Sequence, residues 1–205
     1  AAAFQDSPAR VLLISYFDDK FGEALAEKIP ISLARLDPKA DLGITLDQPG
    51  QALIQEAISH AGPGSIARLV GQFNLVVCCR MLEHAHETKK FVSTLKKFLT
   101  PNGRLLLEIP ESSKSLMQGD VGMLWEEHTN YFTEDSVTRF SLANGLATDK
   151  TWIYEYPQED ALALLLKADD YKYDASVTDL LNCEESVEYS KKLSCYRGTS
   201  RTFLE

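Results

Sequence analysis

The sequence predicts an α/β fold: a doubly wound, mostly parallel sheet of six or seven strands, closed by an antiparallel strand pair. The first observation behind this class is the alternation of short apolar runs with amphipathic segments of helical period, which is the order of parallel β-α-β units. The second is a pair of strand-like segments that follow one another near the end, joined through Pro157-Gln158. Such a sheet binds ligands outside the carboxyl ends of its strands.

The chain opens with a strand, a helix and a second strand. Residues 10–15 are a short apolar run of strand length, and residues 21–28 place their apolar side chains on one helical side before a proline. Residues 31–36 predict the second strand, which ends at Asp37-Pro38. Three elements within so few residues are typical of the first unit of a parallel sheet.

The middle of the chain gives a mixed signal. Residues 51–59 predict a helix that the Ala-Gly-Pro-Gly run at 61–64 ends, and Ser65 is expected to cap another short helix. No third strand is assigned before residue 70. Residues 73–79, Phe-Asn-Leu-Val-Val-Cys-Cys, are a nearly continuous apolar run and predict an interior parallel strand that is covered on both faces.

The second half of the chain repeats the alternation. Apolar residues that recur on one helical face from Phe91 onward predict a helix over 87–99. Residues 111–131 form a polar segment that is longer than most connections, so we expect it to be functional. The remaining predicted elements are the turn Pro101-Asn102-Gly103, a strand over 104–109, a helix capped by Thr133 that ends at Asn144-Gly145, and strands over 147–156 and 160–167.

Composition and charge exclude several classes of protein. The net charge of −9 argues against a nucleic-acid-binding surface, because phosphate contacts need clustered lysine and arginine. No apolar run reaches the roughly 18–20 residues that span a bilayer, and the start of the chain does not have the pattern of a signal peptide, so no membrane contact is expected. The adjacent Cys78 and Cys79 are expected on opposite faces of a strand, as buried thiols of a cytoplasmic protein.

The length suits one domain with an appendage. We expect the domain over residues 1–168 and a polar, partly helical C-terminal extension over residues 169–205, with its helix near 177–193. Flanking domains of a larger protein, or a second copy of the chain, are the protein partners that we expect.

Three separate segments carry one resemblance. They are residues 73–77 with 81–84 (Phe-Asn-Leu-Val-Val and Met-Leu-Glu-His), 99–105 (Leu-Thr-Pro-Asn-Gly-Arg-Leu) and 125–133 (Trp-Glu-Glu-His-Thr-Asn-Tyr-Phe-Thr). The first two segments resemble the fourth strand, its following loop and the entry to the fifth strand of class I, S-adenosylmethionine-dependent methyltransferases. The third segment is similar to one found in sugar C-methyltransferases. The resemblance spans residues 10–167.

The loop after the first strand departs from that family. Residues 11–19 read Val-Leu-Leu-Ile-Ser-Tyr-Phe-Asp-Asp, where the family has V-L-E-I-G-S-N-D-G. Ser15 and Asp19 stand in place of glycines, which let a backbone turn sharply and approach a ligand closely, and Leu13 replaces an acid. Only Asp18 matches at the end of the motif. The resemblance therefore implies a cofactor pocket, and the substitutions predict that this pocket is impaired or reshaped.

The resemblance implies S-adenosylmethionine as the cofactor. The residues expected to bind it are Ser15, Asp18, Asp37, Arg80, Glu83 and His84. Asp37 follows the second strand, where nucleotide-binding folds place a carboxylate that binds ribose hydroxyls; the alternative is an ordinary turn residue before proline. A metal site is not expected, because His84, His86 and Cys79 lie near one tight loop without a fourth ligand.

The catalytic residues implied by the resemblance lie in the third segment. Methylation of a carbon beside a carbonyl needs a base that removes a proton, and histidine has a suitable pKa. By resemblance His128 is this base, and Glu127 and Tyr131 orient it or the acceptor. The alternative is that Trp125, His128 and Tyr131 pack as a lid against the sheet edge.

The predicted function is transfer of a methyl group from S-adenosylmethionine to carbon of a sugar-like or other small-molecule acceptor. The alternative is a non-catalytic methyltransferase-like module that serves as a binding or scaffold unit of a larger protein, which the missing glycines favour. A nicotinamide-dependent oxidoreductase is disfavoured, because the sequence contains no G-x-G-x-x-G motif.

Overall fold

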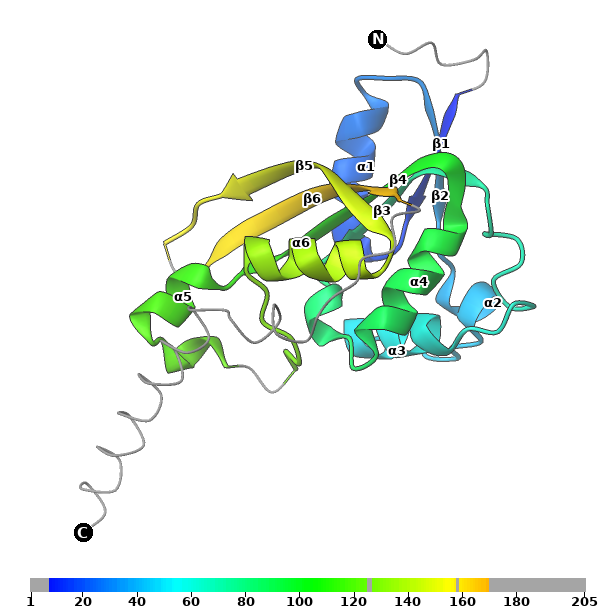
Figure 1. The fold of residues 1–205 in the computed structure, drawn as a ribbon. Coiled ribbons are helices and arrows are strands. Elements are labelled where there is room, and N and C mark those ends of the chain that lie inside the picture. The colour runs from blue at the N-terminus through cyan, green and yellow to red at the C-terminus, as the bar shows by residue number, and fades with distance from the viewer. Residues whose placement is uncertain (1–7, 125–126, 158, 170–205) are drawn as a thin grey trace.

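The computed structural model describes residues 8–124, 127–157 and 159–169, which form a sheet with helices on both faces (Figure 1). Its six strands lie in the order β2-β1-β3-β4-β6-β5. Strands β2, β1, β3 and β4 are parallel to one another, and β6 pairs antiparallel with β4 and β5. The predicted fold class is thereby confirmed. The strands are β1 (Ala9–Leu13), β2 (Ile31–Arg35), β3 (Phe73–Cys79), β4 (Leu99–Glu111), β5 (Leu146–Tyr154) and β6 (Asp160–Ala168).

The helices follow the strands in the alternating order of a doubly wound fold. The α-helices are α1 (Asp19–Ala26), α2 (Pro38–Leu42), α3 (Gln51–His60), α4 (Thr88–Phe98), α5 (Ser113–Gln118) and α6 (Glu134–Ala143), and the 3₁₀ turns are η1 (Tyr16–Asp18), η2 (Leu82–His84) and η3 (Val121–Met123). None of the helices in the described ranges has the length and apolar character of a membrane span. The predicted C-terminal helix near 177–193 and most of the predicted extension lie outside the described residues.

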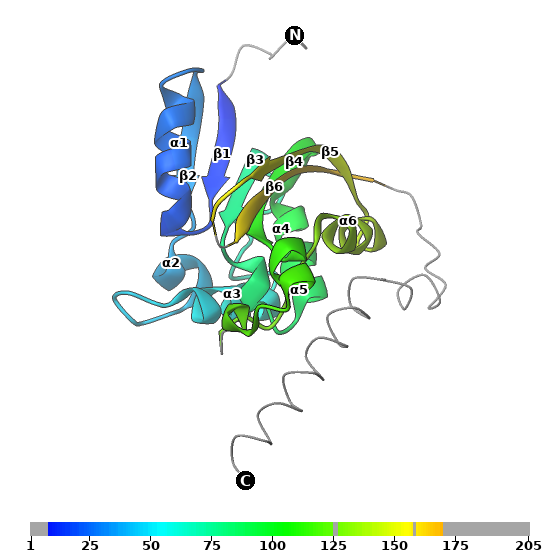
Figure 2. The same cartoon turned by 90° about the vertical axis from the view of Figure 1, so that its left-hand side faces the viewer.

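The apolar core forms two layers, one on each face of the sheet. The larger layer fills the space between the sheet and α3, α4 and α6, and α4 contributes the buried Phe91, Leu95 and Phe98. The smaller layer lies on the face that α1 covers (Figure 2). Cys78 belongs to the larger layer and Cys79 to the smaller one, so the predicted opposite orientation of these buried thiols is confirmed.

Two local predictions are wrong. Ser65 does not cap a helix: its hydroxyl donates to the Gly62 carbonyl at 2.9 Å within a series of turns. The segment 101–103 does not form a free turn but belongs to β4, where a shift in register between Phe73 and Leu75 accommodates it. Both segments contain turn-forming residues, but the structure that they adopt depends on the backbone around them: the Gly62 carbonyl for Ser65, and strand β3 for residues 101–103.

Gly103 lies close to the backbone of β3. A β-carbon at this position would meet the Phe73 carbonyl oxygen at 2.8 Å and the Leu99 β-carbon at 3.1 Å. Because a strand carbonyl cannot turn aside as a side-chain tip can, Gly103→Ala should lower the free energy of unfolding by about 1–3 kcal/mol. Denaturation in urea measures this difference. Gly64→Ala is the control, since its β-carbon would meet nothing within 4 Å. Equal losses in the two variants would contradict the explanation.

Candidate functional site

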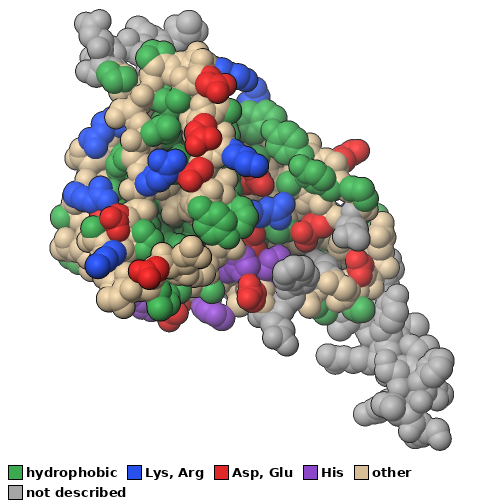
Figure 3. Space-filling model, turned by 180° about the vertical axis from the view of Figure 1, so that it is seen from behind, with side chains coloured by type: hydrophobic (Ala, Val, Ile, Leu, Met, Phe, Trp, Pro, Cys, Tyr) green, Lys and Arg blue, Asp and Glu red, His purple; other side chains and the backbone are tan. Residues whose placement is uncertain are grey.

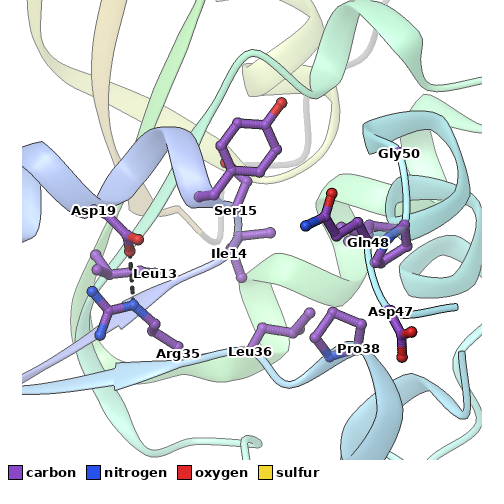
Figure 4. Close-up of a pocket in the computed structure, with 13 residues that line it drawn as sticks. Leu13, Ile14, Ser15, Asp19, Arg35, Leu36, Pro38, Asp47, Gln48 and Gly50 are labelled. Atoms are coloured by element: carbon purple, nitrogen blue, oxygen red, sulfur yellow. Dashed lines mark hydrogen bonds and ion pairs between the residues drawn. The ribbon is translucent and has the colours of Figure 1, made fainter. Parts of the chain in front are cut away.

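Two adjoining hollows lie at the carboxyl ends of β1, β2 and β3. The first crevice, over β1 and β2, has a volume of about 610 Å³ (Figure 4). The second hollow, which we call the histidine pocket, has a volume of about 650 Å³ and lies beyond the end of β3. Neighbouring residues line the two hollows: Tyr16 and Gly50 the first, Phe17 and Gln51 the second. The two hollows therefore adjoin at the edge where parallel strands present ligand-binding loops.

The two hollows differ in chemical character. The first crevice is mainly apolar, and the histidine pocket is polar and acidic. The crevice is lined by Leu13, Ile14, Ser15, Tyr16, Asp19, Arg35, Leu36, Pro38, Asp47, Gln48, Pro49, Gly50 and Ile54. The pocket is lined by Phe17, Gln51, Arg80, Glu83, His84, Ser115, Asp120, Gly122, Glu127, His128 and Glu159. In the space-filling view, histidine side chains (purple) lie together beside acidic ones (red) (Figure 3).

The loop after β1 turns without glycine. Ser15 is extended, with φ −128° and ψ 169°, and its hydroxyl accepts a hydrogen bond from the Phe17 amide at 3.2 Å. Asp19 has the φ of −58° and ψ of −49° of a right-handed helix. Neither residue has a positive φ, so the substitutions for glycine cause no backbone strain. The substitutions change the lining of the crevice instead, because Ser15 and Asp19, together with Tyr16, line it with side chains.

Asp18 binds the backbone of this loop and is not among the residues that line the crevice. Its buried carboxylate accepts from the amides of Ile14 at 2.9 Å, Ser15 at 2.8 Å and Cys79 at 2.9 Å. It thereby joins the carboxyl end of β1 to the end of β3. Burial raises the pKa of Asp18 to about 6, although the amides act in the opposite direction. Asp18 therefore organises the backbone of the site, and it is not among the residues that line either hollow.

Asp37 is not among the residues that line the first crevice. It is the N-cap of α2: its carboxylate accepts from the amides of Lys39 at 2.9 Å and Ala40 at 3.0 Å, and these bonds lower its pKa. We expected Asp37 to bind ribose hydroxyls, with an ordinary turn residue as the alternative. An acid directly before a proline is also a signal for a helix N-cap, which is the position that Asp37 occupies. In the crevice itself, Asp19 pairs with Arg35 at 2.7 Å, as the dashed line in Figure 4 shows.

Arg80, directly after β3, has an unusual backbone. Its φ of 55° makes it the one non-glycine residue with positive φ among the described residues. The Glu108 carbonyl accepts from its amide at 2.8 Å, and its own carbonyl accepts from the Gln51 side chain at 2.6 Å. Its guanidinium lies 3.4 Å from Glu108 and 3.8 Å from Glu159. Such conformations cost about 1–3 kcal/mol and cluster at functional sites.

Glu83, His84 and His128 meet in the histidine pocket. One potential ligand atom from each lies within 4.8 Å of the other two, and the imidazoles of His84 and His128 stand edge to face with centroids 4.8 Å apart. Burial raises the pKa of Glu83 to about 7. Burial, followed by the charges of His84 and Arg80, lowers the pKa of His128 and favours the neutral imidazole that a base needs. Residues far apart in the sequence therefore form one ionisable cluster.

Main-chain hydrogen bonds hold the 127–131 segment over the end of β3. The amides of Thr129 and Asn130 donate to the Glu83 carbonyl at 2.9 and 3.0 Å. The Glu127 carbonyl lies 2.9 Å from Nδ1 of His84, whereas the Glu127 side chain is exposed. The Tyr131 ring lies 6.2 Å from that of His128. The structure thus brings the His128 ring and the Glu127 carbonyl to His84, and it places Tyr131 on His128. Trp125 lies outside the described residues.

The two hollows fit the cofactor that the resemblance implies. Small-molecule sites have volumes of about 300–1,000 Å³ and are mostly apolar, as the first crevice is. Tyr16 offers a ring that is 63% exposed, packed on Phe17 with centroids 4.2 Å apart. The acidic pocket beside it suits a positively charged sulfonium. The aromatic pair and the 47–50 loop were not among the predicted binding residues; Pro49-Gly50 was the signal for that loop.

Comparisons with known proteins agree with this fold. A family model described as "Methyltransferase domain" matches residues 2–174. The fold is similar to that of a 1,6-didemethyltoxoflavin-N1-methyltransferase from Burkholderia thailandensis, solved with S-adenosylhomocysteine, at a TM-score of 0.55 and 13% identity over 80% of this chain and 72% of that one. No curated protein matches the sequence.

Two further structures show how far the likeness reaches. Magnesium protoporphyrin IX methyltransferase from Synechocystis PCC 6803, also with bound S-adenosylhomocysteine, has a TM-score of 0.50 and 17% identity over 78% of this chain and 74% of that one. The [4+2]-cyclase SpnF has a TM-score of 0.53 and 11% identity over 80% of this chain and 76% of that one. Identities this low show the fold alone, and a reaction must be argued from the site.

Proposed function

Because this chain belongs to the class I, S-adenosylmethionine-dependent methyltransferase family, we propose that it methylates carbon of a small-molecule acceptor bound in the histidine pocket. The observation that carries this proposal is the junction of the two hollows at the Tyr16–Phe17 pair. A donor in the first crevice and an acceptor in the second would face each other there. Positioning of this kind supplies much of the catalysis in group transfer.

The first crevice holds the nucleoside part of the cofactor. Leu36, Pro38 and Ile54 provide apolar contact, and Tyr16 offers its exposed ring at the rim. Asp19 and Asp47 are the carboxylates that line this crevice. The cofactor supplies a methyl group already activated as a sulfonium, so the protein needs to add little beyond alignment and removal of a proton from the acceptor.

His128 is the residue that takes this proton. An imidazole nitrogen of His128 would accept the proton of the acceptor C–H bond, and the electron pair left on that carbon would take up the sulfonium methyl group that a cofactor in the first crevice would supply. The lowered pKa of His128 supports this role, because the imidazole is neutral before the reaction. Tyr131 and the Glu127 backbone orient the two imidazoles.

The acceptor class that we propose is a sugar-like molecule with a carbonyl beside the methylated carbon. The resemblance of residues 125–133 to sugar C-methyltransferases supports this class, and so does the polar lining of the histidine pocket. A panel of nucleotide-linked keto sugars with isotope-labelled S-adenosylmethionine tests it. Label on an acceptor carbon is the expected result. Label on oxygen or nitrogen alone would overturn the carbon assignment, and absence of cofactor binding would instead favour the non-catalytic module.

The exposed ring of Tyr16 should contribute to cofactor binding. Tyr16→Ala removes an aromatic contact worth about 0.5–1.5 kcal/mol, so the Kd of S-adenosylmethionine should rise about 2- to 10-fold. Calorimetric titration measures this change. Tyr154→Ala is the matched control, because Tyr154 is 52% exposed on β5 and lines neither hollow. If the two variants bind the cofactor equally well, the crevice is not the cofactor site.

A further inference from the structure

The cluster of Glu83, His84 and His128 has the ligand set of a transition-metal site. The sequence brought together only His84, His86 and Cys79, but His86 is exposed, and burial raises the pKa of Cys79, which keeps its thiol protonated. In the structure, His84 lies instead beside Glu83 and beside His128, which comes from a distant segment of the chain. Two imidazoles and one carboxylate are the protein ligands of many zinc sites that keep one position open.

A buried, unsatisfied oxygen is the second observation. Glu83 is only 2% exposed, and its Oε2 has no hydrogen-bond partner among the described residues. A buried carboxyl oxygen without a partner is costly, and such atoms in folded proteins call for an explanation such as a bound ion. A cation within the cluster would supply the missing interaction.

The orientation of His84 suits a metal ligand. Its Nδ1 lies 2.9 Å from the Glu127 carbonyl oxygen, which can only accept, so Nδ1 is the donor and Nε2 is the nitrogen left for a metal ion. Metal-bound histidines almost always donate their other ring nitrogen to a carbonyl or carboxylate in this way. The hydrogen bond therefore fixes the tautomer that coordination requires.

The charge around the cluster also favours a cation. Besides Glu83, the histidine pocket is lined by Asp120, Glu127 and Glu159, and by one cation, Arg80. The Arg80 guanidinium lies 3.4 Å from Glu108 and 3.8 Å from Glu159, which offset its charge. The three ligand atoms lie within 4.8 Å of one another, and ligands on one tetrahedral zinc ion lie about 3.4 Å apart, so the cluster would contract by up to about 1.4 Å on binding.

We propose that Glu83, His84 and His128 bind one Zn²⁺ or similar divalent transition-metal ion, and that this ion inhibits the enzyme. The inhibitory part rests on the proposed function: coordination uses the lone pair with which His128 accepts the acceptor's proton. An imidazole cannot hold a metal ion and a proton at the same nitrogen. Occupancy by the metal and methyl transfer therefore exclude each other.

Calorimetry on metal-stripped protein tests the binding, with Zn²⁺ alone as the titrant and Co²⁺ as a spectroscopic substitute. One ion per chain with a Kd below about 10 μM is expected. Glu83→Gln, which preserves the shape of the side chain, and His128→Asn should each weaken binding at least about 10-fold. The control His86→Ala should leave it unchanged. Unchanged affinity in both cluster variants, or no binding at millimolar Zn²⁺, would overturn the site.

Turnover with and without Zn²⁺ tests the inhibition separately. Methyl transfer should fall with the same concentration dependence as binding and return when a chelator is added. Turnover that rises with Zn²⁺ would refute the inhibitory role. If no acceptor is methylated under any condition, the proposed function fails, while the calorimetric result still decides whether the metal site exists.

Discussion

Replacing His128 by alanine should lower the turnover of methyl transfer by about 10²–10⁴-fold, the usual contribution of a positioned base. The affinity for S-adenosylmethionine should remain within about twofold, because His128 lines the histidine pocket and not the first crevice. Steady-state kinetics with the labelled donor measures the first quantity, and calorimetry measures the second. A loss of turnover without a loss of cofactor affinity would show that His128 takes part in the chemistry and does not only pack against its neighbours.

The control for this prediction is His60→Ala. His60 is exposed at the end of α3 and lines a separate hollow, so its removal should change neither turnover nor cofactor affinity. If His128→Ala keeps its activity, His128 is only part of a lid, as in the alternative interpretation. If it loses cofactor binding together with turnover, the separation of the two hollows is wrong.

Asp18→Ala should have the largest effect on stability. The carboxylate accepts from three amides that belong to the ends of two neighbouring strands. The Ile14 amide also reaches the Val77 carbonyl at 3.1 Å, so the variant leaves mainly the amides of Ser15 and Cys79 unpaired. Each unpaired buried donor costs about 1–3 kcal/mol, and we expect a loss of about 3 kcal/mol in the free energy of unfolding.

Urea denaturation of Asp18→Ala beside Asp19→Ala makes a matched comparison within one loop. Asp19 forms an exposed ion pair with Arg35, with side chains 36% and 54% exposed, and such pairs contribute about 0–1 kcal/mol. Similar losses in the two variants would show that the amide contacts of Asp18 contribute little. The match of Asp18 to the family motif would then need another explanation.

The elements that the sequence predicted well are those whose signal is local. The apolar run 73–79 coincides with β3, and the helical face around Phe91 gave α4 within about one residue at each end. Asp37-Pro38 was less informative, because a strand end, a turn and a helix cap all use this pair. Asp37 is a helix cap here because the residues that follow it form α2, which the sequence did not predict.

The candidate site was predictable in part for the same reason. Arg80, Glu83 and His84 follow a strand whose position was clear, so their place at the ligand-binding edge could be expected. The proximity of His128 to Glu83 was not predictable, since it depends on amides that bind a carbonyl more than 40 residues away. The position of the Asp18 oxygens had the same dependence on distant backbone.

The attachment of the 127–131 segment has a consequence for how the chemistry of this site can change. The amides of Thr129 and Asn130 anchor it, and amides are present whatever side chains the segment carries. Residues 127 and 128 could therefore be exchanged for other functional groups without releasing the segment from η2. A scaffold built in this way lets new reactions arise by single substitutions, and a library randomised at these two positions is a practical starting point for redirecting the chemistry.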